Sequence, residues 1–296
     1  MQDVRTAVAL VNMPFSYSKY PSIQLGTLSA LLKSKDIPVD CHHLNVRFAH
    51  KIGVPLYETI CEKRALFGEW IFSYLLFRDN PKRAEYPRLF KPVFEQVAKE
   101  SGHPASFFED MAARTAPQFL TWALTAIDWG QYKIVGFTST FDQNVASLTM
   151  AKLIKDLYPN VTIVFGGANY DGEMGLEYFR AFPFIDHVVV GEGEEVFPLL
   201  VRYILAGTGG TVPGGVVHDL PSDLREALIA NATALDARND ITPLARNEFI
   251  CWVEDAKQAK TRQRRIARTV EELLEGKRRP CCWSGCIHRT DKSGRG

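Results

Sequence analysis

The sequence lacks the features that would place the protein in a membrane or outside the cell. No run of about 18 apolar residues occurs, so no segment is long enough to span a bilayer. The N-terminus, MQDVRTAVALVNMPF, lacks the charged-then-apolar pattern and small-residue cleavage site of a signal peptide. Six cysteines in 296 residues are too few for a disulfide scaffold. We therefore expect a soluble protein of the reducing cytoplasm, with no membrane partner.

The sequence also lacks an excess of charge of either sign and lacks phosphate-binding motifs. With 35 basic and 34 acidic residues, the net charge of +1 gives no general attraction to nucleic acid, which we do not expect as a partner. A dinucleotide site would need G-x-G-x-x-G after the first strand, but that position holds Asn12-Met13-Pro14-Phe15-Ser16. No Walker pattern occurs either. These absences argue against the common nucleotide-binding α/β proteins.

The sequence does contain a regular alternation of strand-like and helical segments. Short apolar runs predict strands at residues 6–13, 37–44, 132–137, 161–165 and 185–190. Apolar residues at helical spacing predict helices at 23–34, 144–157, 173–182 and 196–205. This order predicts an α/β fold with a doubly wound, parallel, five-stranded Rossmann-like sheet. Residues 45–129 are aromatic and charged and interrupt the alternation, so we expect a helical insertion there, with helices at 66–77 and 116–127.

Composition changes after the glycine-rich segment 206–215. Residues 221–277 contain no strand-like run and predict a small all-α module with helices at 222–229, 243–257 and 261–275. Pro243 suits the first turn of the second of these helices. We therefore predict two domains, 1–217 and 218–296, the second ending in a basic tail that contains cysteines.

The loops after the predicted strands are the candidate binding site, because ligands of open parallel sheets lie at the carboxyl ends of the strands. The loop after the third strand offers hydroxyl groups, which can donate and accept hydrogen bonds. Small residues after the fourth strand let a bulky, flat ligand approach the backbone. Acidic residues after the fifth argue against a phosphate ligand. The candidate residues are Thr138, Ser139, Thr140, Asp142, Gly166, Gly167, Ala168, Gly191, Glu192 and Gly193.

Five segments in order carry a resemblance to a known family: VALVNMPF, the helix start PSIQLG with Pro21 and Leu25, VGFTSTFDQN, IVFGGANYDGEMG and VVVGEGEEVFPLL. Together, residues 5–217 resemble the cobalamin-binding domain that precedes the catalytic barrel of cobalamin-dependent radical-SAM enzymes. The likeness is greatest to maturases of ribosomally made peptides. It implies that the loops named above, with Pro21 and Leu25, bind a corrinoid.

The resemblance also bears on the cobalt ligand. Many cobalamin domains carry D-x-H-x-x-G in the first strand-to-helix loop, where the histidine ligates cobalt, but that loop has no histidine here. His42 and His43 lie at the end of the second strand instead, with Asn45 in place of the glycine, and we interpret them as polar loop residues. The resemblance thus implies base-off cobalamin without a histidine ligand from the protein, its lower face covered by the 138–142 loop.

The cysteine pattern of the related barrel is missing. A radical-SAM enzyme needs C-x-x-x-C-x-x-C to hold an iron–sulfur cluster through thiolates. The nearest match, Cys282 and Cys286, has Arg289 at the third position, and the chain ends soon afterwards. We expect no iron–sulfur cluster and no complete enzyme, but a cofactor-binding module. Two alternatives are an α/β enzyme that uses Asp142, Asp171 and Glu192 for metal or acid–base chemistry, and a non-catalytic interaction protein with an empty α/β domain.

A second resemblance covers residues 219–289. The stretch ITPLARNEFICWVEDAKQAKTRQRRIARTVEELLEGKRRPCCWSGCIHR is similar to the C-terminal part of the YdeI/OmpD-associated family, sometimes described as bacteriocin-protection proteins. An aromatic residue is often expected near Arg238 in that family. The resemblance implies a helical module that interacts with a protein partner, with no catalytic mechanism. The two resemblances meet near residue 218, which indicates a fusion, natural or artificial.

Two features of this second domain have competing interpretations. The basic stretch 257–268 could face nucleic acid or an acidic partner, but a solvated helix face partly offset by Glu271, Glu272 and Glu275 is the simpler interpretation. Cys281, Cys282, Cys286 and His288 could bind zinc, or could be free thiols in a loosely ordered tail.

Overall fold

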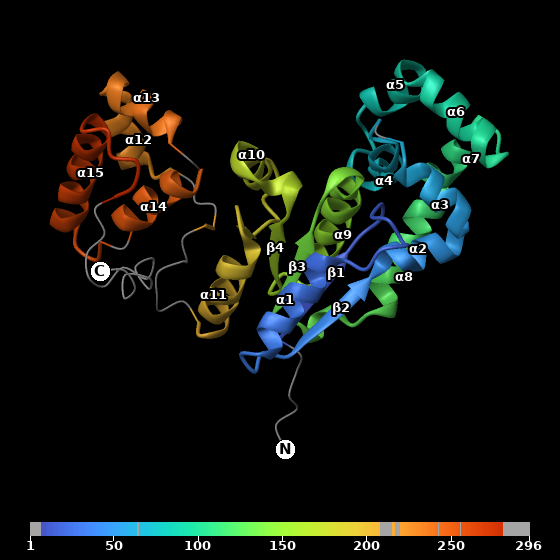
Figure 1. The fold of residues 1–296 in the computed structure, drawn as a ribbon, viewed down its shortest axis with the longest axis horizontal. Coiled ribbons are helices and arrows are strands. Elements are labelled where there is room, and N and C mark those ends of the chain that lie inside the picture. Colours follow the sequence, from blue (N-terminus) through green and yellow to red (C-terminus); the bar gives the residue numbers. More distant parts are fainter. Residues whose placement is uncertain are drawn as a thin grey trace. The chain divides into compact units, whose positions relative to one another are not determined.

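The computed structural model describes residues 7–63, 65–207, 215–216, 220–241, 243–254 and 256–280 (Figure 1). The chain divides into two compact units, which are described separately. The first contains residues 1–169 and 183–186, and the second contains residues 170–182 and 187–296. In the described part of the chain, no helix is long and apolar enough to cross a membrane.

Five strands form one parallel sheet in the order β2-β1-β3-β4-β5. They are β1 (Val8–Asn12), β2 (Val39–His43), β3 (Ile134–Thr138), β4 (Thr162–Gly166) and β5 (His187–Val188). Asn12 lies opposite both His43 and Thr138, and Thr138 lies opposite Gly166, so four strands end in one row. The predicted five-stranded parallel sheet is confirmed. Its strand order reverses between β1 and β3, the place where such sheets bind ligands.

Two helices of the first unit, α1 (Ile23–Lys33) and α9 (Asn144–Leu157), follow β1 and β3. The Ser22 hydroxyl accepts the Leu25 N–H at 3.3 Å and caps the start of α1. The predicted helix start is therefore confirmed. The Leu25 side chain is buried and belongs to the core. Helix α9 has the predicted bounds because its apolar residues recur at helical spacing.

Residues between β2 and β3 form the predicted helical insertion. Its helices are α2 (Leu44–Ile52), α3 (Val54–Cys61), α4 (Phe67–Leu76), α5 (Lys82–Leu89), α6 (Lys91–Ser101), α7 (Ala105–Asp110), a π-helical turn (Met111–Thr115), α8 (Ala116–Ala126) and a 3₁₀ turn (Trp129–Gln131). The insertion packs on the loop after β1 through Phe15. This ring stacks on Tyr57 at 5.0 Å and meets the edges of Phe48 and Phe72. Burial of this aromatic cluster stabilises the insertion against the sheet.

The second unit begins with α10 (Gly172–Ala181) and continues after β5 with α11 (Gly193–Leu205). Strand β5 has two residues, whereas the sequence predicted six, and the cause is local pairing. Val189 forms an antiparallel bridge with Val216, and the Val190 N–H donates to the Gly215 carbonyl at 2.7 Å. The returning chain therefore takes the hydrogen bonds that would have extended β5.

The C-terminal module consists of α12 (Ser222–Ile229), α13 (Ala232–Asp240), α14 (Pro243–Glu254) and α15 (Ala259–Leu274). Its core joins residues from all four helices: Leu224, Leu228, Ala234, Ile241, Ala245, Phe249, Ile250, Val253, Ile266 and Leu273. Helix α13 was not predicted, although Asn231 caps it by accepting the Ala234 N–H at 3.1 Å. Its sequence, ATALDARND, lacks the apolar spacing by which the other helices were recognised.

Candidate functional site

The loops after β1 and β3 are locked together by Gln143, which is 1% exposed. Its Nε2 donates to Asn12 Oδ1 and to the Met13 carbonyl, both at 2.6 Å. Its Oε1 accepts from the Thr140 N–H at 3.2 Å and from the Thr140 hydroxyl at 2.9 Å. The protein's own side chain therefore occupies the point where strand order reverses. Sequence reasoning missed this residue, because its partner Asn12 is far away along the chain.

The loop after β4 packs closely on the loop after β3. Asn169 Nδ2 donates to Ser139 Oγ at 2.9 Å and to the Phe141 carbonyl at 2.8 Å. Gly167 has a φ of +97°, and a Cβ added there would lie 2.7 Å from the Ser139 carbonyl oxygen. A glycine is thus required by the neighbouring loop, whether or not a ligand also approaches it.

The predicted site residues of the first unit fall into two groups. Pro21, Gly167 and Ala168 are exposed, and Thr138, Thr140 and Gly166 are half-buried at the carboxyl edge of the sheet. Ser139, Asp142 and Leu25 are buried. The first group can meet a ligand directly, whereas the second supports the loops from within.

Asp142 and Glu69 cap each other's helices. Asp142 Oδ2 accepts the Gly68 N–H at 3.1 Å, in the first turn of α4. Glu69 accepts the N–H groups of Asn144 at 2.9 Å and Val145 at 2.5 Å, in the first turn of α9. A carboxylate at a helix N-terminus satisfies donors that lack partners within the helix. Asp142 therefore fastens the insertion to the sheet.

Both capping carboxyl groups titrate close to neutrality. Burial raises the pKa of Glu69 to about 8, although the two backbone N–H groups oppose this shift. Burial also raises the pKa of Asp142 to about 6, against the N–H of Gly68. The neighbouring Asp142 carboxylate also contributes to the raised pKa of Glu69.

The His42 side chain, on β2, makes structural contacts with Tyr132 and Trp129. Its Nε2 lies 3.0 Å from the Tyr132 hydroxyl, and its ring lies 5.3 Å from that of Trp129. The Tyr132 hydroxyl donates to Asp40 Oδ2 at 2.9 Å, so it accepts from His42. Burial lowers the pKa of His42, partly offset by Asp40. Both histidines lie at the end of the predicted strand 37–44 and pair with β1, so they are strand residues and not the polar loop residues of our interpretation.

Exposed apolar side chains gather on loops at the same edge and were not predicted as site residues. Phe141, in the loop after β3, is 82% exposed and has a φ of +49°. Tyr17, Tyr20 and Ile23, from the segment after β1, are exposed as well, and the two tyrosine rings lie 6.2 Å apart. A large exposed side chain on a strained backbone is a mark of functional surfaces. The signal in the sequence was a phenylalanine within the polar run TSTFDQ.

Two buried acceptors near the loop after β1 have no hydrogen-bond donor among the described residues: Asn45 Oδ1 and Glu58 Oε2. Asn45 is 1% exposed and Glu58 is 4% exposed. The other carboxylate oxygen of Glu58 accepts the N–H and hydroxyl of Ser18 at 2.8 and 2.6 Å, and the Lys19 ammonium lies 3.7 Å from Oε2. Buried acceptors without donors cost free energy, so this side of the edge favours a donor from outside the chain.

The three predicted residues of the second unit precede or open α11. Gly191 and Glu192 are exposed, and Gly193 is the first residue of the helix. Glu194 and Glu195 lie in its first turn, where negative charge stabilises the helix dipole. The helix dipole therefore accounts for the acidic residues Glu194 and Glu195 of this segment.

Among the described residues, no three His, Cys, Asp or Glu side chains are grouped so that they could hold a metal ion. Cys281, Cys282, Cys286 and His288 lie outside the described residues.

Comparison with known protein families gives a match in the C-terminal module. Residues 218–276 match the family described as bacteriocin-protection, YdeI or OmpD-associated. This range contains α12 to α15 and confirms the resemblance found there in the sequence. No curated protein matches the chain. The cobalamin resemblance of residues 5–217 stays a prediction.

Proposed function

We propose that the α/β domain binds base-off cobalamin at the carboxyl edge of its sheet, without a histidine ligand from the protein. The observation that carries this proposal is the row of small and hydroxyl-bearing residues there. Thr138 and Thr140 are half-buried, and Gly167 and Ala168 are exposed, so a broad ligand meets polar and small groups along these loops, beside the exposed ring of Phe141. Large cofactors of parallel sheets bind at this edge.

The polar groups of the edge suit the periphery of a corrin ring. Primary amides surround this ring, and their N–H groups need acceptors. Among the described residues, Asn45 Oδ1 is a buried acceptor without a donor, and the two threonine hydroxyls can accept as well. When bound, cobalamin supplies a cobalt centre for methyl-group or radical chemistry. The residues of this chain bind and orient it, and Phe141 offers an apolar ring to one face.

The domain acts as a cofactor-holding module. The sequence contains no C-x-x-x-C-x-x-C motif, which the iron–sulfur cluster of a radical-SAM barrel would need. The YdeI/OmpD-associated module supplies the protein-binding function. Its four helices enclose a core of their own, which leaves their outer faces for a partner.

The proposal is tested by titrating the full chain with hydroxocobalamin, followed by visible absorbance and calorimetry. Ala168→Trp is expected to weaken binding at least tenfold, because it places an indole on the exposed loop. Ala126→Trp is the matched control: Ala126 is exposed at the end of α8, which leads toward the opposite edge of the sheet. If the parent chain binds cobalamin and Ala168→Trp binds it with the same affinity, this loop is not part of the site.

A second candidate function is acid–base chemistry, favoured by the raised pKa values of Asp142 and Glu69. Both carboxyl groups, however, are buried and accept backbone N–H groups, as structural caps do. A sample that stays colourless with cobalamin and loses a hydrolytic activity on Asp142→Asn would favour this alternative.

A further inference from the structure

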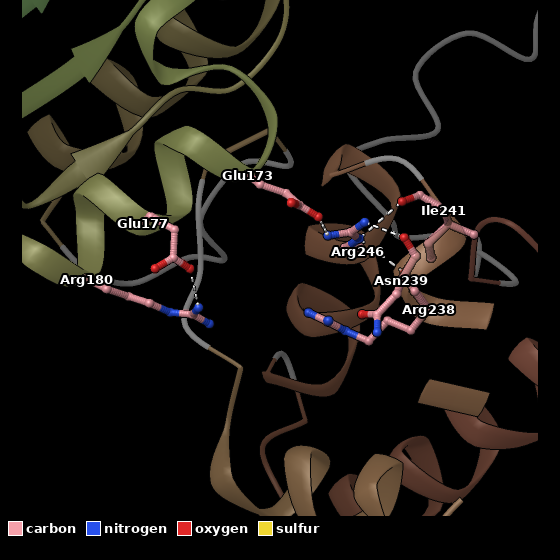
Figure 2. A network of polar contacts seen from close by, with 7 residues as sticks. All are labelled: Glu173, Glu177, Arg180, Arg238, Asn239, Ile241 and Arg246. Carbon is pink, nitrogen blue, oxygen red and sulfur yellow. Dashed lines mark hydrogen bonds and ion pairs between the residues drawn. The ribbon is translucent and has the colours of Figure 1, made fainter. Parts of the chain in front are cut away.

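Three arginines approach one another in the second unit: Arg180 on α10, Arg238 on α13 and Arg246 on α14 (Figure 2). Arg238 is the position near which the sequence comparison led us to expect an aromatic residue. A guanidinium group in its place calls for a physical explanation.

Two of the three arginines are held by carboxylates of α10. Arg180 Nη1 donates to Glu177 Oε1 at 2.9 Å, and Arg246 Nη1 donates to Glu173 Oε1 at 3.1 Å. Arg246 also caps the end of α13. Its Nε donates to the carbonyls of Arg238 and Ile241, both at 3.1 Å, and its Nη2 donates to the Asn239 carbonyl at 2.5 Å. These contacts fix the guanidinium of Arg246 in one orientation.

The Arg238 guanidinium has no carboxylate partner and no hydrogen-bond acceptor among the described residues, although it is partly buried. Burial, together with the charges of Arg246 and Arg180, lowers the pKa of Arg238 to about 10. A partly buried cation beside two like charges is unfavourable unless an anion joins it. Arg180 and Arg246 each pair with a carboxylate of α10, whereas no ion pair of Arg238 occurs among the described residues.

We propose that Arg180, Arg238 and Arg246 form a binding site for a phosphate group. Figure 2 shows the side chains of Arg180 and Arg238 extending toward one another from their helices. One guanidinium group pairs with both oxygens of a carboxylate. Two guanidinium groups that face one ligand therefore offer more N–H donors than a carboxylate can accept. A tetrahedral phosphate presents oxygens in several directions and can accept from both forks. The ligand is inorganic phosphate or a phosphate monoester, and this site is independent of the cobalamin proposal.

The test uses the full chain with inorganic phosphate and with phenyl phosphate, measured by calorimetry and by thermal unfolding. Sodium acetate and sodium chloride at equal ionic strength serve as controls. Phosphate is expected to bind saturably below about 10 mM and to raise the melting temperature, because it binds the folded state alone. Stronger binding of phenyl phosphate would identify a monoester as the ligand, and equal binding would identify inorganic phosphate.

Arg238→Gln is expected to weaken phosphate binding at least tenfold, and Arg238→Lys to restore part of it, because lysine keeps the charge but loses the fork. Arg264→Gln is the matched control, since Arg264 is exposed on α15 of the same unit. Without phosphate, Arg238→Gln should melt no lower than the parent, because it removes an uncompensated charge. Unchanged phosphate affinity in Arg238→Gln, equal binding of acetate, or no binding of either phosphate compound would overturn the proposal.

Discussion

Replacing Glu69 by glutamine should change how the stability of the α/β unit depends on pH. The Glu69 carboxylate accepts two backbone N–H groups at the start of α9, and it is buried beside Asp142. Burial raises its pKa to about 8 from an ordinary value of 4.5. A folded-state pKa above the unfolded one means that the protonated form fits the folded state better. The contribution of Glu69 is therefore fully present below pH 4.5 and is lost as pH rises through about 8.

The magnitude follows from the difference between the two pKa values. From 4.5 to about 8, at about 1.4 kcal/mol per pH unit, ionised Glu69 lowers the free energy of unfolding by about 5 kcal/mol. Glutamine cannot ionise, but its NH₂ group cannot accept a backbone N–H. At pH 5, Glu69→Gln should therefore be less stable than the parent by about 1–3 kcal/mol. Above pH 8 this difference should vanish or reverse.

The assay is urea unfolding followed by tryptophan fluorescence and circular dichroism between pH 4.5 and 9. Other groups titrate in this range, so the difference between parent and variant at each pH is the quantity to compare. Glu95→Gln is the control, because Glu95 is exposed and forms an i,i+4 pair with Lys91. Parallel pH profiles of parent and Glu69→Gln would refute the reasoning, since a removed carboxyl group with a raised pKa must change the slope.

Two further substitutions test the packing of each unit. Gly167→Ala should destabilise the first unit by about 1–3 kcal/mol, because the φ of Gly167 is +97° and the new methyl group would meet the Ser139 backbone. The control is Gly26→Ala, which lies in open space inside α1 and should be neutral or stabilising in the same urea titration. Phe249→Ala should cost the C-terminal module about 3–5 kcal/mol, because Phe249 is 1% exposed in its core. Loss of helical circular dichroism at lower temperature measures this effect, and an unchanged melting curve would contradict the core assignment.

The regular parts of the fold could be predicted from the sequence because their information is local. Helix α9 has clear apolar periodicity, and the strands are short apolar runs that alternate with helices along the chain. Helix α13 was missed because its nine residues lack that periodicity, and β5 was overpredicted because Val216 returns to pair with Val189. The first failure is a local pattern that is too weak, and the second comes from a contact with a distant part of the chain.

The candidate site could be predicted only as a set of loops. Gly167 and Thr140 were recognised by residue type, but their partners were not. Gln143 bonds Asn12 across 131 positions, and Glu69 caps a helix start 75 and 76 positions away. Such pairs depend on how the insertion folds back onto the sheet, which no local pattern records.

The central claim is that the carboxyl edge of the sheet binds a corrinoid. The most direct measurement is equilibrium titration of the full chain with hydroxocobalamin, read by visible absorbance after removal of free cofactor. We expect one equivalent to stay with the protein, with a spectrum that lacks the lower nitrogen ligand of cobalt. No retained cobalamin at about 50 µM protein and cofactor would contradict the account.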